Sequence, residues 1–330
     1  MIRVNAEHVK QVPGRKTDAK DCQWIAPPLQ RGLLKASFVP PVPIRELPDL
    51  TRQRAQLIQE RAAAVNRIQK VLEDADGKLA GVATDVLGAS GRDMPEALIA
   101  GETDPAPLAD LARKRLREEL PALRRASQGR VTGHHRFLLR VHPDHVTPLE
   151  ELLGRLGARI EEALAPSAEA AGRLQAIPGV SQRVAEAVVA EIGTRMEQFP
   201  GADHLASWAG MCSGNNASAG QRRRGRITKG NRWRKRILVQ AAWAASHTTG
   251  TYLAAPYRRL AKRRGCQRAL VAVGHALLVI AYPVLKRGTT YAELGADFPD
   301  RLEPARLTRR LVKRLEALGP RVTLEPCPAA

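Results

Sequence analysis

The sequence has few cysteines, and they are widely separated. Four are present, and no two of them form a C-x-x-C pair: Cys22, Cys212, Cys266 and Cys327. This spacing argues against a zinc ribbon and against a disulfide framework, and it suits the reducing cytoplasm. We also expect no signal peptide and no membrane span, because no uninterrupted apolar run reaches about 18 residues. The most hydrophobic segment, Ala269–Leu285, contains a glycine, a histidine and a proline, and we expect it to form a buried helix.

Aromatic and acidic residues are also scarce. Aromatic residues make up 4% of the chain, and alanine, leucine and valine supply most of its apolar mass, which favours helices over a sheet-rich core. With 330 residues and 44% hydrophobic content, the chain is long enough for two or three domains with real cores. Lys and Arg number 53 against 33 Asp and Glu, so the formal net charge is +20. This excess favours a polyanionic partner, nucleic acid in particular, over a merely solvated arginine-rich surface.

Two aspartates near the start of the chain are candidate metal ligands. A short strand-like run, Ile2–Ala6, and a turn at Pro13–Gly14 precede them. Asp18 and Asp21 are three residues apart, so on a helix their carboxylates share one face, where they can hold Mg²⁺. Alternatively, the pair caps a helix and faces solvent, because phosphodiester cleavage with two metals needs three or four carboxylates.

The middle of the chain is predicted to be helical. A proline-rich connector, Ser37–Pro48, leads into apolar residues that recur every three, four or seven positions, as in a long amphipathic helix or a coiled-coil arm. The expected helices span residues 47–72, 108–123 and 146–164, and we interpret residues 41–165 as long antiparallel helices. The histidine-rich segment His134–His145 is a possible metal site, but no cysteine or paired carboxylate completes a ligand set, and solvated or packed imidazoles are the favoured alternative.

The segment Leu174–Gly193 predicts two short helices joined by a tight turn. The turn sequence I-P-G-V, with apolar residues at helical spacing around it, is typical of a helix-hairpin-helix motif. Backbone N–H groups at such a turn, around Pro178 and Gly179, can hold a DNA phosphate without reading the bases. The alternative is a tight corner between two helices inside a globular domain.

Ser218 stands between small residues at the front of a strongly basic run. Gly214 and Gly220 allow the loop around it unusual backbone angles. A serine hydroxyl is a poor nucleophile unless a base, a metal or a cationic environment activates it, and no histidine lies nearby in the sequence. From the residues themselves, Ser218 is either a nucleophile cradled by cations or an ordinary loop residue. The cations expected to contact nucleic acid are Arg222, Arg223, Arg224, Arg226, Lys229, Arg232, Arg234, Lys235 and Arg236.

Four motifs occur in order along the chain. They are V-N-A-E-H-V-K-Q-V-P-G-R-K-T-D-A-K-D, G-L-L-K-A-S-F-V-P-P, I-P-G-V and S-W-A-G-M-C-S-G-N-N-A-S-A-G. Together they resemble the transposases of the insertion-sequence one-ten family, which includes the Piv-type invertases. The resemblance implies that Ser218 is the nucleophile that becomes linked to DNA, and that Asp18 and Asp21 are the last two residues of an Asp-Glu-Asp-Asp set that binds Mg²⁺. It also implies a guide RNA encoded by the element, and we expect a homo-oligomer, either a dimer or a tetramer, without membrane association.

The same resemblance implies a mainly α fold in four parts. These are residues 1–40, a fragment of a RuvC-like (RNase H-like) α/β nuclease domain; 41–165, a helical coiled-coil region; 166–300, a serine transposase domain with a helix-hairpin-helix; and 301–330, a basic tail. In the family, the first Asp and the Glu of the metal set precede the V-N-A strand, so we expect an N-terminally truncated transposase that is weak or inactive.

Two departures lie close to the nucleophile position. Ser213 and Ala217 stand where many relatives have a proline and a glutamate, and the second change either weakens the activation of Ser218 or is neutral. The alternative function is a non-catalytic DNA- or RNA-binding remnant or regulator that assembles with full-length transposase. A remnant of this kind would keep the helical arm and the basic surface without the chemistry.

Overall fold

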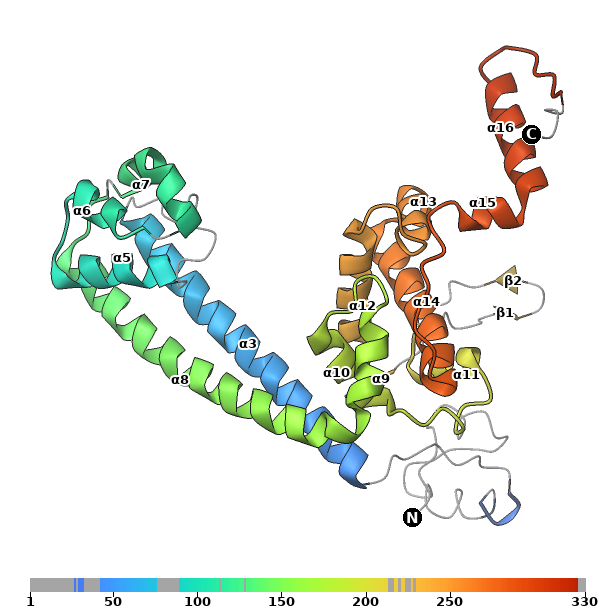
Figure 1. Cartoon of the computed structure of the whole chain (residues 1–330), viewed down its shortest axis with the longest axis horizontal. Helices are drawn as coiled ribbons and strands as arrows, with labels where there is room; N and C mark the ends of the chain where they lie inside the picture. Colours follow the sequence, from blue (N-terminus) through green and yellow to red (C-terminus); the bar gives the residue numbers. More distant parts are fainter. Residues whose placement is uncertain are drawn as a thin grey trace. The chain divides into compact units, whose positions relative to one another are not determined.

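A computed structural model describes residues 27, 29–32, 42–75, 89–112, 114–127, 129–212, 217–218, 221–222, 227 and 230–325. The described part is mainly helical, as the composition predicts. The chain divides into two compact units: unit 1 comprises Met1–Pro48 and Pro166–Ala330, and unit 2 comprises Asp49–Ala165. Figure 1 shows the helices of both units along the chain. The predicted metal ligands Asp18 and Asp21, and the strand-like run before them, lie outside the described residues.

Two long helices form the body of unit 2. Helix α3 (Val42–Asp74) and helix α8 (Gly133–Leu164) run antiparallel (Figure 1). The backbone N–H of Arg130, just before α8, donates to the carbonyl of Ala75, just after α3. Further along both helices, the guanidinium of Arg61 pairs with the carboxylate of Glu150 at 2.8 Å. The predicted helix at 47–72 is confirmed, and the apolar periodicity there buries its residues as expected.

Three boundaries predicted in this region are wrong, and prolines explain two of them. Helix α3 already begins at Val42 inside the predicted connector, because a proline in the first turn needs no N–H partner. The helix expected at 108–123 is three short pieces: α6 (Pro105–Asp110), the 3₁₀ helix η2 (Lys114–Glu119) and α7 (Leu120–Ala126). Pro121 cannot continue a helix from η2, so it starts a new one in the first turn of α7.

Helix α8 begins at Gly133 rather than near Val146, so it takes in the histidine-rich segment. The hydroxyl of Thr132 accepts from the backbone N–H of His135, and Nδ1 of His135 accepts from the backbone N–H of Thr132. Together the two hydrogen bonds make a capping box. Within the residues that the structure describes, no group of three His, Cys, Asp or Glu side chains is placed to hold a metal ion. One residue of the histidine-rich segment, His135, therefore helps to cap the helix.

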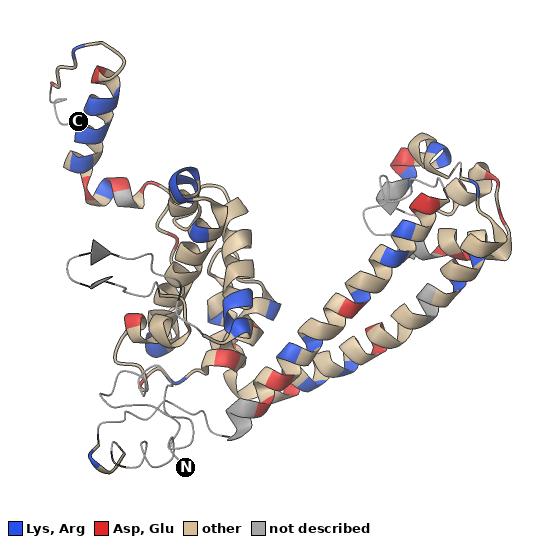
Figure 2. Cartoon of the chain, turned by 180° about the vertical axis from the view of Figure 1, so that it is seen from behind, with Lys and Arg blue, Asp and Glu red and all other residues tan. Residues whose placement is uncertain are grey.

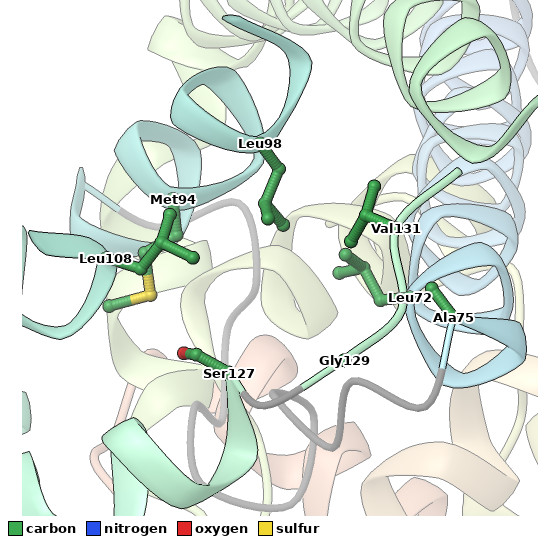
Figure 3. Close-up of a pocket in the computed structure, with 8 residues that line it drawn as sticks. All are labelled: Leu72, Ala75, Met94, Leu98, Leu108, Ser127, Gly129 and Val131. Carbon is green, nitrogen blue, oxygen red and sulfur yellow. The ribbon is translucent and has the colours of Figure 1, made fainter. Parts of the chain in front are cut away.

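Unit 2 has its own apolar core. Helix α5 (Ala89–Ala100) packs on α6 and α8, and the core buries Ile68, Leu72, Met94, Leu108, Leu123 and Leu139. Figure 3 shows a small pocket in this core. The side chains that line it are apolar except for Ser127, whose buried hydroxyl has no hydrogen-bond partner among the residues that the structure describes.

Unit 1 is built around helix α14 (Cys266–Arg287). The helices that pack on it are α9 (Ala168–Gln175), α11 (Ala202–Trp208), α12 (Arg232–His247) and α13 (Ala254–Arg264). Of the described helices, α14 is long and apolar enough to cross a membrane, yet half of its most apolar stretch is buried within the unit. The glycine, histidine and proline inside it do not interrupt it, so the predicted buried helix is confirmed and extended at both ends.

The C-terminal part, which was expected to be a basic tail, contains a basic amphipathic helix. Helix α15 (Phe298–Leu302) is followed by α16 (Pro304–Glu316), which has no buried residue. Figure 2 shows the Lys and Arg residues along α13 and α16. No carboxylate occurs within α13, and the only one within α16 is Glu316. These helices add to the positive charge of unit 1.

Candidate functional site

Ser218 lies in a small antiparallel hairpin. Strand β1 (Ala217–Ser218) pairs with strand β2 (Gln221–Arg222), with Ala217 opposite Arg222 and Ser218 opposite Gln221. Ser218 is therefore the last residue of β1, and the sequence Ala-Gly links it to β2. Two-residue connections in hairpins commonly contain glycine, so the A-S-A-G-Q sequence carries a hairpin signal that the mainly α interpretation overlooked.

The loop that holds this hairpin is closed at its base by two glycines. Gly210 has a φ of 74°, and a Cβ on it would lie 2.6 Å from the Cα of Gly230. A Cβ on Gly230 would lie 2.8 Å from the carbonyl oxygen of Ala209. Because no side chain fits between the two backbones, the chain before the hairpin and the chain after it come together at Gly210 and Gly230.

A buried carboxylate ties this base to helix α10 (Gln182–Ile192). The side chain of Glu191 is 4% exposed, and its Oε2 accepts from Nδ2 of Asn231 at 3.3 Å. The same oxygen lies 3.7 Å from Nε of Arg234. At its other end, the Asn231 amide oxygen accepts from the N–H of Trp233 at 2.8 Å and so caps α12.

Trp208 completes what we call the loop-base cluster, namely Glu191, Trp208, Asn231 and Arg234. The guanidinium carbon of Arg234 lies 3.7 Å from the ring centroid of Trp208, a cation–π contact. Trp208 in turn packs against the ring of Phe199, with centroids 5.3 Å apart. A buried ion pair that is also stacked and hydrogen-bonded fixes geometry more than it adds stability. The cluster therefore holds both ends of the Ser218 loop in register.

The predicted nucleic-acid contacts differ in where the structure places them. Arg222 is described as part of β2, whereas Arg223, Arg224, Arg226 and Lys229 lie outside the described residues. Arg232 and Arg236 are exposed on α12, and Lys235 is half-buried. The side chain of Arg234 is 15% exposed and is directed to Glu191 and Trp208, so its position suits the support of the loop.

The I-P-G-V turn joins α9 to α10, as the sequence predicts. Gly179 has a φ of 85°, and a Cβ on it would lie 2.4 Å from the carbonyl oxygen of Ala241 and 2.5 Å from the nitrogen of Ala245. The glycine therefore lets the turn pack directly on the backbone of α12. The role of Pro178 and Gly179 in phosphate binding stays a prediction, while the close packing of Gly179 on α12 is a feature of the fold.

One thiol stands at the edge of the loop. Burial raises the pKa of the Cys212 thiol above its ordinary value, and the nearby carboxylate of Asp203 raises it further. The proton therefore stays on the sulfur at neutral pH, so Cys212 is a poor base or nucleophile for a reaction at Ser218.

Sequence reasoning missed three residues of the loop-base cluster. Asn231 carries the signal of a helix N-cap, because it directly precedes an amphipathic run. Glu191 interrupts the apolar run A-V-V-A-E-I, and a carboxylate in such a place is rarely buried without a partner. Trp208 carries no local signal, since its importance depends on an arginine far along the chain.

Comparisons with known proteins cover most of the chain. A family model described as the transposase IS116/IS110/IS902 family matches residues 171–258, which include the hairpin and the loop-base cluster, and a model of DEDD transposases matches residues 1–75. A probable family 20 transposase of Pseudomonas aeruginosa is 26% identical over 284 residues, which cover 85% of this chain and 75% of that protein. The transposase for insertion sequence element IS1111A of Coxiella burnetii is 24% identical over 297 residues, 87% of this chain and 72% of that protein. Both family models and both relatives are transposases, and together they support an insertion-sequence transposase of the IS116/IS110/IS902 type.

Proposed function

We propose that this transposase cuts and rejoins DNA through the hydroxyl of Ser218. The oxygen of Ser218 attacks a phosphodiester phosphorus, a Ser–O–P bond forms, and the bond from phosphorus to one sugar oxygen breaks. The departing sugar oxygen gains a proton, and the serine hydroxyl loses one. A second sugar hydroxyl then attacks the phosphoserine in the reverse sense, which rejoins the strand and frees Ser218.

The observation that carries this proposal is the way the Ser218 hairpin is mounted. Its loop lies inside the segment matched by the family model, and it closes on a buried cluster that restricts both of its ends. A nucleophile must be held in position while its target is brought to it, because misplacement of about 1 Å costs orders of magnitude in rate. The loop-base cluster supplies such a support, and none of its four residues belongs to the loop that carries Ser218.

The other groups have separate parts in the proposal. The cations Arg222, Arg223, Arg224 and Arg226 would hold the attacked phosphate and stabilise the charge that develops on it. Asp18 and Asp21 would hold Mg²⁺, which supplies further charge stabilisation at the phosphate. The I-P-G-V turn would contact the DNA backbone, and a guide RNA and a second copy of the chain would complete the assembly in the cytoplasm.

The test is a search for the covalent intermediate. The purified chain is incubated with end-labelled DNA of the insertion-sequence ends, Mg²⁺ and the RNA transcribed from the element, and label is followed on denaturing gels. We expect a protein–DNA adduct that maps to Ser218 by mass spectrometry. Ser218→Ala removes it, while Ser207→Ala is the matched control, because Ser207 is an exposed serine on α11.

The other outcomes separate this proposal from the alternatives. An adduct that persists in Ser218→Ala would mean that another residue is the nucleophile. If the wild-type chain binds the DNA but forms no adduct under any of these conditions, the chain acts as a non-catalytic binding protein. Loss of the adduct in Asp18→Asn and Asp21→Asn, with DNA binding retained, would support the part given to Mg²⁺.

A further inference from the structure

One face of α12 is exposed along the whole helix. Its residues follow one another at spacings of four, four, three and four, so they share a face. We call them the α12 stripe: Arg232, Arg236, Gln240, Trp243 and His247. The opposite face is buried through Leu238, Ala241, Ala242 and Ala245. The stripe contains two cations, no carboxylate and one large aromatic ring.

The aromatic ring of the stripe is both exposed and fixed in place. Trp243 is 57% exposed, while Trp208 and Trp233 are partly buried. The imidazole of His247 lies against the indole, with ring centroids 4.4 Å apart. Nδ1 of His247 lies 2.8 Å from the carbonyl oxygen of Trp243, to which it donates, so the ring is anchored to the same turn of helix. Trp243 is therefore a supported aromatic surface that remains open to solvent.

The stripe begins where the Ser218 loop ends. Asn231, which closes the loop through Glu191, is also the N-cap of α12, and Arg232 is the next residue. From Arg232 to Trp243 the helix rises about 17 Å, which is the length of about five stacked nucleotides. A DNA strand held near the loop can thus continue along the stripe to the indole.

We propose that the α12 stripe binds one strand of DNA, with Arg232 and Arg236 on phosphates and Trp243 stacked on an unpaired base. The occupant is a single strand, because cations beside an open aromatic face fit a backbone whose bases are unstacked, whereas a duplex presents only base edges. The inference rests on the proposed function, which places a strand break at Ser218 and so frees bases beside α12. Trp243 then holds the strand near the break.

The test uses a fluorescently labelled 12-nucleotide single-stranded DNA and measures its anisotropy with the full chain. We expect Trp243→Ala to weaken binding about tenfold, as is common for the loss of one stacked base, and Trp243→Phe to weaken it less. A set of oligonucleotides with one abasic site, moved along the sequence, locates the stacked base. When the abasic site replaces the stacked base, the wild-type chain should bind the oligonucleotide more weakly than it binds the intact one. Trp243→Ala should bind the two oligonucleotides equally well.

Two further variants test the remaining parts of the proposal. Arg236→Gln should reduce the slope of log affinity against log salt by about 0.7, the value for one contact to a single strand. Phe137→Ala in unit 2 is the matched control, since Phe137 is a 65% exposed aromatic residue outside the stripe, and it should bind like the wild type. Thermal melts followed by circular dichroism check that each variant is folded.

Three results would overturn the proposal. They are unchanged DNA binding by Trp243→Ala, an equal loss on intact and fully abasic oligonucleotides, and a clear preference for RNA of the same sequence. Failure of this proposal is distinguishable from failure of the serine mechanism, because Ser218→Ala should bind the oligonucleotide normally. If a base stacks on Trp243 but no adduct forms on Ser218, the α12 stripe remains a DNA-binding site and only the proposed serine mechanism fails.

Discussion

Gly179→Ala should destabilise unit 1 strongly, because the turn has no room for a methyl group. The added Cβ would lie 2.4 Å from the carbonyl oxygen of Ala241, 2.5 Å from the nitrogen of Ala245 and 2.8 Å from its Cβ. Two of these atoms belong to the backbone of α12 and cannot rotate away, so the helices must separate. Overpacking of this kind costs about 1–3 kcal/mol. The φ of 85° adds about 1–2 kcal/mol for an L-residue.

Together these costs amount to about 2–5 kcal/mol, or about 5–15 °C in the melting temperature of a unit of this size. Tryptophan fluorescence reports the change selectively, since all four tryptophans lie in the segments of unit 1. The matched control is Gly172→Ala, seven residues earlier in α9, where an added Cβ meets nothing within 4 Å. That change should stabilise the unit by about 0.5–1 kcal/mol, because alanine favours the helix.

The contrast between the two glycines decides the reasoning. If both variants melt within about 2 °C of the wild type, the I-P-G-V turn does not pack on α12 as described. If Gly179→Ala melts low but still binds DNA normally at low temperature, the turn supports the fold and does not contact phosphate. If binding is lost while the melting temperature is unchanged, the turn acts directly on DNA and the packing argument fails.

Three further predictions concern other buried groups. Glu191→Ala should lower the stability of unit 1 by about 3 kcal/mol, because it leaves Arg234 largely buried without this carboxylate; Glu191→Gln should cost less, and equal losses would contradict a charge effect. Ser127→Ala should raise the stability of unit 2 by about 1 kcal/mol, because it removes a buried hydroxyl that has no hydrogen-bond partner in the described part of the chain. Melts followed by circular dichroism measure this change, and a loss of stability would mean that the hydroxyl has a partner outside that part. Alkylation of Cys212, followed by mass spectrometry, should require a higher pH in the folded than in the urea-unfolded chain, since burial and Asp203 raise the pKa of the folded thiol. Asp203→Asn should shift the dependence of the alkylation rate on pH to lower pH, and an unchanged dependence would exclude that carboxylate as a cause.

The helices of this chain were predictable where apolar periodicity was long and uninterrupted. Helices α3 and α14 both bury residues at helical spacing, and the mainly α fold follows from such segments. Two of the errors fall at prolines in the first turn of a helix, a position where proline is well tolerated, and Pro48 and Pro283 lie inside helices without ending them. Pro121 was therefore taken into one long helix when it starts a separate one. Thr132 capped α8 earlier than the apolar pattern alone suggested.

The loop-base cluster was less predictable than the loop it supports. The basic run and the glycines around Ser218 are local features, so the sequence marks the loop directly. Glu191 and Asn231 form a hydrogen bond although they are 40 residues apart in the sequence, and the residues around either one do not indicate that the other is its partner. A buried carboxylate needs a partner, but its identity depends on how α10 and α12 cross. The support of a site is therefore harder to predict than the site.

The run N-R-W-R-K-R at the start of α12 shows why a count of charges overestimates a binding surface. Arg232 and Arg236 are four residues apart and share the exposed face of the helix. Arg234 lies halfway between them in sequence, so the helical period of 3.6 residues turns it to the opposite side, over Trp208 and beside Glu191. Helical phase thus divides one basic segment into two exposed cations, which are the proposed phosphate contacts, and one internal support. The exposed cations of this region are therefore available for the proposed DNA contact, while the internal one supports the loop that is proposed to cut DNA.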